Sequence, residues 1–402
     1  MKKWLLMVLA CLLLCTTADA RTKTPQYSLP TKGCEVLQNE AIRDIALPAT
    51  AAIHNQIAGE SPVTGQPWEG WYFPMLVQIS NATDTVRWNG KNIKTAGVGK
   101  RAPWGLQFAD IVYEECLTTI GNTRFAALFS DCFAQNQPAL GVGPVRSARY
   151  GSLLLREEWQ SGLVYGGGFL RSFGVTDETS NRFLEQTGVL DRGVLFHTAS
   201  SQYRPMCYRV KGKKMPDNLN ADILQMRQSV AETAMAAPRP FLFSQDAYTD
   251  GAYAQAGVIH LDWGLSDTIS HFVYDSQTGT YGRYCGAGVN PARWAPFAAL
   301  TTPEEMPGDT SEPLRYANLI VQRVAYEMDQ GSAIRLMEQS VGRGNADIFL
   351  GGKYIPGVWV RPSVSEPTVF YDDQGQELQL RRGKTYIALL PGEALCAYGQ
   401  EP

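Results

Sequence analysis

The chain has 402 residues, a formal net charge of −3 and 44% hydrophobic residues. This length exceeds what a single hydrophobic core usually serves, so we expect two domains. A near-neutral, slightly acidic composition argues against a nucleic-acid-binding protein, which needs a surplus of basic charge. Beyond the N-terminus no stretch approaches the roughly eighteen apolar residues of a membrane-spanning helix, so we expect no transmembrane segment in the mature chain.

The N-terminus has the pattern of a secretory signal peptide. Residues 1–20 begin with two lysines, continue as an apolar run, and end in Ala18-Asp19-Ala20, which has the small-x-small form of a cleavage site. Cys15 lacks the small residue that a lipobox places before its cysteine, and Cys11 leaves a very short apolar segment. We therefore expect an exported, extracytoplasmic protein that is secreted or associated with the cell envelope, without a lipid anchor.

Composition divides the rest of the chain into three parts. Residues 21–60 resemble a tether with one short helix, and the turn-forming residues of Ser61-Pro-Val-Thr-Gly-Gln-Pro67 mark a boundary. Residues 61–236 mix strand and helix patterns, whereas residues 241–398, which follow the Pro238 to Pro240 linker, hold short apolar runs separated by glycine, asparagine and aspartate. The expected class is α+β, with a mixed α/β N-terminal domain followed by a mostly β C-terminal domain.

Two strands and a tight turn are predicted early in the N-terminal domain. The runs 111–119 and 123–130 alternate around a three-residue loop, which is typical of a hairpin. If Thr119 pairs with Thr123, Glu114 and Arg124 project from the same face, with an offset of about 13 Å along the strands. We expect both side chains to reach toward the next segment or toward a ligand. A further buried strand is predicted at 73–80.

The segment from Gly141 to Trp159 predicts a loop that runs into a helix. Gly141, Gly143 and Pro144 interrupt regular structure, and Ser147 is a suitable N-cap. Arg146 and Arg149 would then lie at the helix start, where backbone N–H groups favour an anion and guanidinium groups fit a carboxylate or phosphate. The alternative is that both arginines pair with carboxylates of this chain.

The residues that follow add a second polar group. The run 162–168 predicts a strand that ends in a glycine turn, but the glycine spacing does not match a dinucleotide fingerprint. His197 can exchange a proton near neutral pH, and Asp191 could orient it; Arg192 lies beside them. A single histidine near serines is more often structural than catalytic. An amphipathic helix is predicted from Asn218 to about Ala236.

Five segments carry a resemblance to a known family. They are Ala109-Asp-Ile-Val-Tyr-Glu114, Gly121-Asn-Thr-Arg-Phe125, Gly143-Pro-Val-Arg-Ser-Ala-Arg149, Ala317-Asn-Leu-Ile-Val-Gln322 and Gly383-Lys-Thr-Tyr386. In this order they resemble the YerB family of bacterial lipoproteins, over roughly residues 61–391. The family is itself a domain of unknown function, so the resemblance implies a two-part architecture and no reaction.

Cysteine and histidine spacing predicts neither a metal site nor a bound cofactor. Six cysteines follow the signal peptide, and an even number in an exported chain suggests disulfides, although several could be buried thiols. None forms a Cys-x-x-Cys pair. The six are Cys34, Cys116, Cys132, Cys207, Cys285 and Cys396.

Two functions from different classes fit these patterns. The favoured one is a binding protein whose partner is an anionic cell-envelope component or an envelope protein. Its expected binding residues are Arg146, Ser147, Arg149, Arg124, Glu114, Asp191, Arg192 and His197. The alternative is a cell-envelope hydrolase or transferase in which Glu114, Asp191 or His197 transfers a proton. The first is favoured because no recognised catalytic spacing is present.

Overall fold

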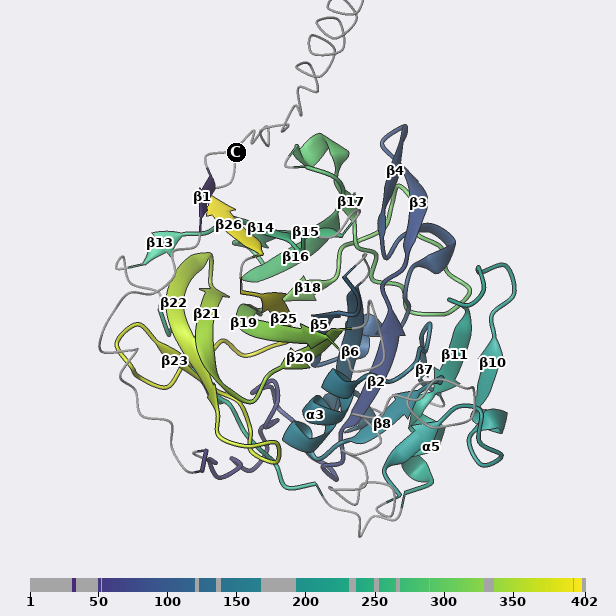
Figure 1. Cartoon of the computed structure of the whole chain (residues 1–402), viewed down its shortest axis with the longest axis horizontal. Coiled ribbons are helices and arrows are strands. Elements are labelled where there is room, and N and C mark those ends of the chain that lie inside the picture. The colour runs from purple at the N-terminus through teal and green to yellow at the C-terminus, as the bar shows by residue number, and fades with distance from the viewer. Residues whose placement is uncertain are drawn as a thin grey trace, which may run out of the picture.

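The protein is mostly β and is built around two stacked sheets, as the computed structural model shows (Figure 1). The structure describes residues 31–33, 50–51, 53–119, 123–134, 139–167, 193–230, 236–248, 253–264, 268–288, 290–328, 336–392 and 394–399. Among these residues, no helix is both long enough and apolar enough to cross a membrane.

The larger sheet has twelve strands and is called the central sheet. In spatial order they are β13 (Ala254–Gln255), β22 (Lys353–Arg361), β21 (Gly342–Leu350), β19 (Asn318–Met328), β25 (Thr385–Pro391), β5 (Ile111–Cys116), β6 (Thr123–Phe129), β2 (Met75–Ser80), β8 (Gly162–Tyr165) and β9 (Leu195–His197). Two more strands extend it: β20 (Leu336–Gln339) pairs with β19, and β23 (Val369–Asp372) pairs with β22.

Most strands in the middle of the central sheet run the same way. β19, β25 and β5 pair in parallel, as do β2, β8 and β9. β6 is antiparallel to both β5 and β2 and joins the two groups. The sheet therefore has a carboxyl edge, where the six parallel strands end, and an amino edge, where they begin.

The smaller sheet is antiparallel and covers one face of the central sheet. Its strands are β1 (Thr31–Gly33), β26 (Leu395–Gly399), β14 (Val258–Asp262), β15 (Ile269–Asp275), β16 (Thr280–Cys285), β17 (Ala295–Pro296) and β18 (Arg315–Tyr316). Aromatic rings fill the space between the sheets: Tyr386 of β25 lies 4.9 Å from Phe272 and 5.2 Å from Tyr316, measured between ring centroids.

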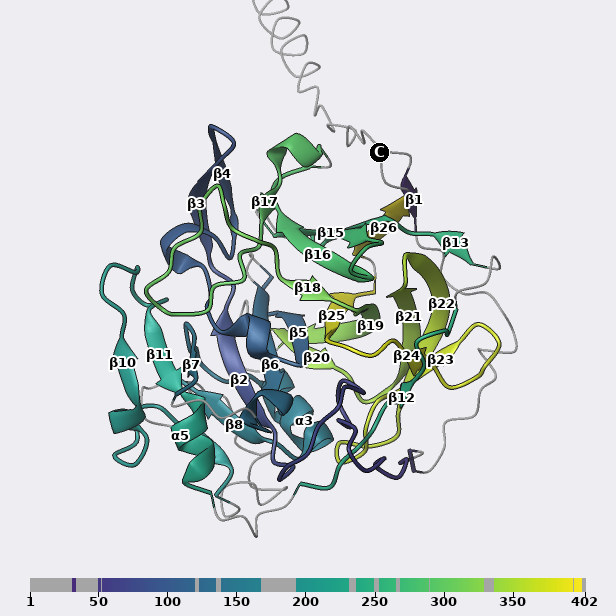
Figure 2. The ribbon, with the colours of Figure 1, turned by 180° about the vertical axis from the view of Figure 1, so that it is seen from behind.

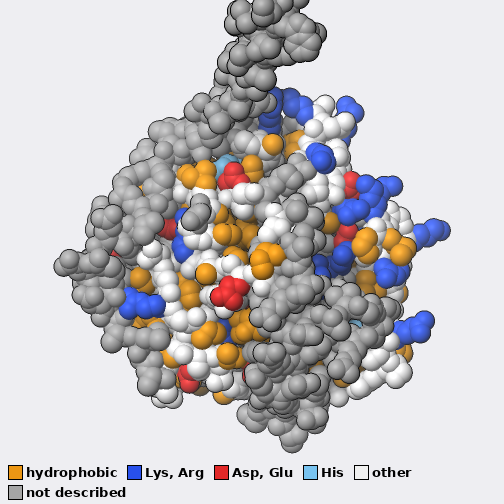
Figure 3. All heavy atoms as spheres, in the orientation of Figure 1, with side chains coloured by type: hydrophobic (Ala, Val, Ile, Leu, Met, Phe, Trp, Pro, Cys, Tyr) orange, Lys and Arg blue, Asp and Glu red, His pale blue; other side chains and the backbone are white. Residues whose placement is uncertain are grey.

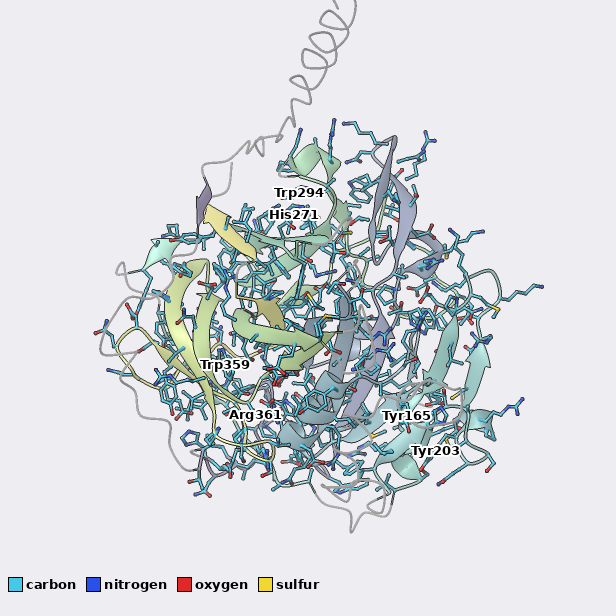
Figure 4. All side chains as sticks on the ribbon, in the orientation of Figure 1. Tyr165, Tyr203, His271, Trp294, Trp359 and Arg361 are labelled. Carbon is cyan, nitrogen blue, oxygen red and sulfur yellow. The ribbon has the colours of Figure 1, made fainter. Side chains whose placement is uncertain are left out.

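Helix α3 (Tyr150–Trp159) covers the opposite face of the central sheet (Figure 1). The Trp159 Nε1–H donates to the hydroxyl of Tyr113 on β5 at 2.8 Å. Arg361 of β22, labelled beside this helix in Figure 4, donates from Nη2 to the Leu154 carbonyl at 2.7 Å. All its residues after Tyr150 are buried, which is typical of a helix enclosed by other elements.

Smaller elements surround these layers. They are β3 (Thr83–Trp88) paired with β4 (Lys91–Ala96), β7 (Gly141–Val142), β10 (Cys207–Arg209), β11 (Leu219–Asp222), β12 (Leu242–Phe243) paired with β24 (Gln379–Leu380), helix α5 (Ile223–Gln228) and the 3-10 turns η1 (Gly99–Arg101), η2 (Leu106–Phe108), η3 (Asp131–Ala134), η6 (Arg204–Met206) and η7 (Pro291–Arg293). Seen from behind, β12 and β24 lie beside β23 (Figure 2).

Several sequence predictions are confirmed in outline. Strands form at 75–80 and 162–165, as predicted from the runs at 73–80 and 162–168. The mostly β character is confirmed, while the mixed α/β character of residues 61–236 stays a prediction. The boundary between the two expected domains also stays a prediction, and strands from both share the central sheet where β25 pairs with β5.

Other predictions are wrong in their details. The expected helix from Asn218 begins as strand β11, and α5 starts only after Asp222, whose carboxylate accepts the Gln225 N–H at 3.2 Å. Part of the expected tether, Thr31–Gly33, is an edge strand. Disulfides were expected, but Cys116, Cys207 and Cys285 are free thiols; Cys34 and most of the signal peptide and tether lie outside the described residues.

Candidate functional site

The predicted arginines lie at the carboxyl edge of the central sheet. The loop that carries them is bonded to two strands: the Arg146 N–H donates to the Gln78 carbonyl of β2 at 2.8 Å, and the Gly166 N–H, just after β8, donates to the Arg146 carbonyl at 2.8 Å. Arg124 reaches the same edge because β6 runs in the opposite direction. Ligands of sheets with parallel strands commonly bind at this edge.

Arg146 and Arg101 share one buried carboxylate, that of Asp217. Arg146 Nη1 lies 2.5 Å from Asp217 Oδ1, and Arg101 Nη1 lies 3.0 Å from Oδ2. The Ser80 hydroxyl, at the end of β2, donates to Oδ1 at 2.5 Å. The Asp217 side chain is 1% exposed, whereas those of Arg146 and Arg101 are 26% and 30% exposed. Both cations therefore keep an outer side that a partner could reach.

Arg124 is buried behind this pair. It is 5% exposed and donates from Nη1 to the Ser147 carbonyl at 2.5 Å, while its Nε–H has no partner among the described residues. Burial, together with the nearby positive charges of Arg149 and Arg146, holds its pKa well below the ordinary value of an arginine. Arg124, Arg146 and Arg149 thus form a cluster of like charges.

Helix α3 begins at Tyr150, later than predicted, and Ser147 is not its N-cap. The Ser147 carbonyl accepts from Arg124, and the Ala148 N–H donates to the Gly167 carbonyl at 2.9 Å, which ties the loop to the turn after β8. Helical bonding starts after these contacts. At the helix start, the Arg149 N–H donates to the Ser152 hydroxyl at 3.0 Å, which donates to the Arg149 carbonyl at 2.6 Å.

Two buried glutamates lie beneath the first turn of α3. Glu115 comes from β5 and Glu338 from β20, and a Cβ placed on Gly151 would collide with both side chains. Burial raises the pKa of Glu115 to about 7, against the opposing effect of Arg124 and Arg149. Burial and the nearby Glu115 raise the pKa of Glu338 to about 8. One carboxyl oxygen of each has no hydrogen-bond partner among the described residues.

Glu114 lies on the other face of β5, away from the arginines, so the predicted hairpin register is wrong. Cys116 pairs with Thr123, which places Glu115 opposite Arg124 and Glu114 opposite Phe125. The Glu114 carboxylate is 0% exposed and lies between the two sheets. It accepts hydrogen bonds from Asn81 Nδ2 and Arg283 Nη2 and from the hydroxyls of Thr123 and Tyr386.

His197 ends β9 at the carboxyl edge, and Asp191 and Arg192 lie outside the described residues. The His197 ring stacks on Tyr165 with centroids 5.0 Å apart, and partial burial lowers its pKa. Figure 4 labels Tyr165, the last residue of β8, and Tyr203, which lies near α5. Two further histidines, His260 and His271, are buried in the smaller sheet. Their Nδ1 atoms are 3.0 Å apart, and His271 stacks on Trp294, beside which it is labelled in Figure 4.

No motif in the sequence pointed to Asp217, Arg101, Ser80 or Glu115 as residues of this site. The closest signal is the basic run from Arg209 to Lys214, which leads directly into the segment containing Asp217. Within the described ranges, no three His, Cys, Asp or Glu side chains are grouped closely enough to hold a metal ion.

Two family models match the chain in succession. The N-terminal domain of a protein of unknown function (DUF3048) matches residues 96–236, and the C-terminal domain of the same family matches residues 259–387. The chain belongs to the DUF3048 family. The site loop and β6, which carries Arg124, fall in the first match, and the second match ends at residue 387, within β25.

A solved structure supports the fold. The crystal structure of the YerB protein from Bacillus subtilis is 20% identical in sequence and superposes with a TM-score of 0.60, covering 84% of this chain and 99% of that one. The YerB-like resemblance read from the sequence is therefore confirmed. Comparison with curated proteins finds no match.

Proposed function

We propose that the carboxyl edge of the central sheet binds an anionic group, a carboxylate or phosphate, on a cell-envelope component or an envelope protein. The observation that carries the proposal is the clustering of like charge around buried Arg124. Arginines placed together depress one another's affinity for protons, and an added anion relieves that repulsion. An internal role as simple ion pairs would require a carboxylate for each cation.

Two of the cations share one carboxylate: Arg101 and Arg146 both pair with Asp217. Glu115, which faces Arg124, has a pKa of about 7 and is partly protonated near neutral pH. Among the described residues, Arg101, Arg124 and Arg146 therefore share the full negative charge of Asp217 and the partial charge of Glu115. A bound anion would add negative charge beside these guanidinium groups and would accept charge-assisted hydrogen bonds from them.

The surrounding surface is basic although the whole chain is acidic. Blue side chains gather over β3, β4, β10 and β11 in Figure 3. A hollow of about 360 Å³ beside the β3–β4 hairpin is lined by Lys91, Lys94 and Arg293, with no acidic residue in its wall. This surface would attract an extended anionic partner toward the arginines. The exposed basic residues of this surface are Lys91, Lys94, Lys100, Arg209, Lys211 and Lys214, of which Lys214 pairs with Asp84 at 2.7 Å.

The enzymatic alternative receives less support from the geometry. Glu114 is enclosed between the sheets with its hydrogen bonds made, and it shares no cavity with Arg146 and His197 among the described pockets. His197 is placed at the correct edge. Its ring stacks on Tyr165, so we place His197 at the rim of the binding site and give it no role in proton transfer.

The test is titration of the full chain with phosphate, citrate and a poly-glutamate, followed by thermal shift and calorimetry. Arg146→Lys and Arg149→Lys keep the charge but lose the planar fork. Loss of one charge-assisted contact of about 1.5–3 kcal/mol should weaken binding roughly ten- to a hundredfold. Arg315→Lys is the matched control, because Arg315 is half-exposed and pairs with Asp275 elsewhere at 3.2 Å.

The salt dependence adds a second readout, since binding through arginines should weaken as ionic strength rises. Asp217→Asn should lower the melting temperature and, in the chain that remains folded, strengthen anion binding because it removes the internal competitor. If no anion stabilises the wild type while both lysine variants melt far below the control, the arginines serve the fold alone and the proposal fails.

A further inference from the structure

The opposite, amino edge of the central sheet contains a second cavity. It has a volume of about 640 Å³, within the usual range of small-molecule sites. Three polar residues reach it from strand ends: Asp110 directly precedes β5, Asp131 lies two residues after the end of β6, and Lys384 directly precedes β25. The aromatic side chains of Trp68 and Phe108 complete its wall.

Asp110 is held in a fixed orientation. Its Oδ2 accepts the N–H groups of Ser130 at 2.6 Å and Asp131 at 2.9 Å, and no hydrogen bond to Oδ1 is made by the described residues. The residue is 3% exposed, and burial together with the nearby Asp131 raises its pKa to about 8. A carboxyl group fixed through one oxygen leaves the other available to a ligand.

Several polar groups in and around the cavity have no hydrogen-bond partner among the described residues. Lys384 lies near both aspartates, but its Nζ is within 4 Å of no carboxylate oxygen in the described part of the chain, and burial lowers its pKa. Both amide atoms of Gln107 and the Nε1–H of Trp68, which is 8% exposed, are shielded from solvent and lack partners among the described residues. Unpaired buried polar groups are costly, and a ligand hydroxyl can satisfy those that a side-chain rotation brings to the cavity wall.

We infer that this cavity binds a neutral polyhydroxylated ring, a carbohydrate, at a site separate from the arginines. The wall combines the carboxyl groups of Asp110, Asp131 and Glu69 with the ammonium group of Lys384, so neither a simple anion nor a simple cation matches it. A neutral hydroxyl uses both, because it donates to a carboxylate and accepts from an ammonium or amide group. The apolar faces of Trp68 and Phe108 suit the C–H surface of a sugar ring, and the Gln107 amide reaches a hydroxyl after rotation of its own side-chain bonds.

The test is a ligand-observed NMR screen of the full chain with chitobiose, cellobiose and maltotriose, followed by calorimetry on any sugar that binds. Gln107→Ala and Asp110→Asn should each weaken binding by at least about tenfold, the value of one well-made polar contact. Gln277→Ala, at an exposed position in the β15–β16 turn, is the matched control and should bind as the wild type does.

Gln107→Ala should fold normally, since no described residue bonds to its amide, and it keeps the test decisive if Asp110→Asn unfolds. Arg146→Lys should leave sugar binding unchanged, which separates this site from the proposed anion site. The inference is overturned if none of the sugars binds, if spermidine or phosphate occupies the cavity instead, or if both cavity variants bind a sugar as tightly as the control.

Discussion

Glu114 and Glu115 are neighbours on β5, but their carboxyl groups lie on opposite faces of the central sheet and have different partners. Glu114 faces the smaller sheet and is met by Arg283 at 3.1 Å and by three further donors. Glu115 faces α3, leaves one oxygen unbonded among the described residues, and shares its surroundings with another carboxyl, Glu338. Burial is complete in both places, so the difference lies in the partners and not in solvent access.

We call the face that carries Glu114 compensated, because donors surround its buried carboxylate, and the face that carries Glu115 and Glu338 uncompensated, because their carboxyl groups lack such donors. The Glu114 carboxylate accepts from four donors, which fixes the packing of the elements that supply them, although Arg283 Nε and Nη1 have no partners among the described residues. A buried acid without such partners stays protonated to a higher pH, as Glu115 and Glu338 do. The face toward α3 also leads to the arginine cluster, so the uncompensated region is the one that adjoins the proposed binding site.

The largest expected loss of stability comes from removing the charge of Glu114 on the compensated face. Glu114→Gln removes the partner of Arg283, a side chain that is 2% exposed, and leaves an unpaired charge between the sheets. Breaking a buried pair in this way costs about 3–5 kcal/mol of unfolding free energy, measurable by urea titration. Glu115→Gln is the matched control on the same strand and should cost far less. Equal losses in the two variants would contradict the contrast.

The buried acids on the uncompensated face should make the unfolding free energy depend on pH. A carboxyl whose folded pKa is raised contributes stability that is complete below its unfolded pKa of 4.5 and is lost as pH rises through the folded value, about 8 for Glu338. Glu338→Gln removes this dependence, at about 1.4 kcal/mol per pH unit. We expect the variant to gain roughly 2–3 kcal/mol over the wild type between pH 6 and pH 8.

Urea titrations at intervals between pH 5 and pH 8 measure that gain. Glu312→Gln, an exposed position, should run parallel to the wild type throughout. A gap between Glu338→Gln and the wild type that stays constant with pH would mean that Glu338 is ionised in the folded protein across the whole range.

A smaller effect should follow from moving α3 away from the glutamates. Gly151→Ala places a methyl group against Glu115 and Glu338, and overpacking of this kind costs about 1–3 kcal/mol, partly offset by the better helix propensity of alanine. Thermal unfolding should show a net loss near 1–2 kcal/mol. Gly308→Ala, where a Cβ meets nothing within 4 Å, controls for the substitution itself.

The smallest effect concerns the hydrogen bond that fixes α3 to β5. Tyr113→Phe leaves the buried Trp159 Nε1–H without its 2.8 Å acceptor, at a cost of about 1 kcal/mol. Tyr208→Phe, whose hydroxyl is at an exposed position 3.4 Å from Glu304, should change stability by much less. A loss of several kcal/mol for Tyr113→Phe would show that α3 depends on more than packing.

The sequence predicted the strands that local pattern can specify. The apolar runs at 73–80 and 162–168 located β2 and β8, because these signals depend on residues a few positions apart. Family membership was also accessible, since its motifs are contiguous. Arginines near a helix start were predicted correctly as a group, although the helix begins three residues later than Ser147 because the loop first bonds to Arg124 and Gly167.

The register of the β5–β6 hairpin could not be obtained in the same way. Every residue of both strands is buried, so alternation between apolar and polar residues does not distinguish the faces. The partners of the site are also distant in sequence: Arg146 and Asp217 are 71 positions apart, and Glu114 and Arg283 are 169 apart. Such contacts follow from the topology of the sheet, which no local pattern specifies.

The position of β25 has a consequence for how the chain reaches this structure. Residues 385–391 lie between β19 and β5, yet they follow every other strand of the central sheet along the chain and leave the ribosome after them. Until they arrive, β5 has one open edge, and pairing across so long a stretch of chain makes folding slow. A chain that stops before residue 385 should therefore fail to complete its sheet and should aggregate, however normal its first three hundred residues are.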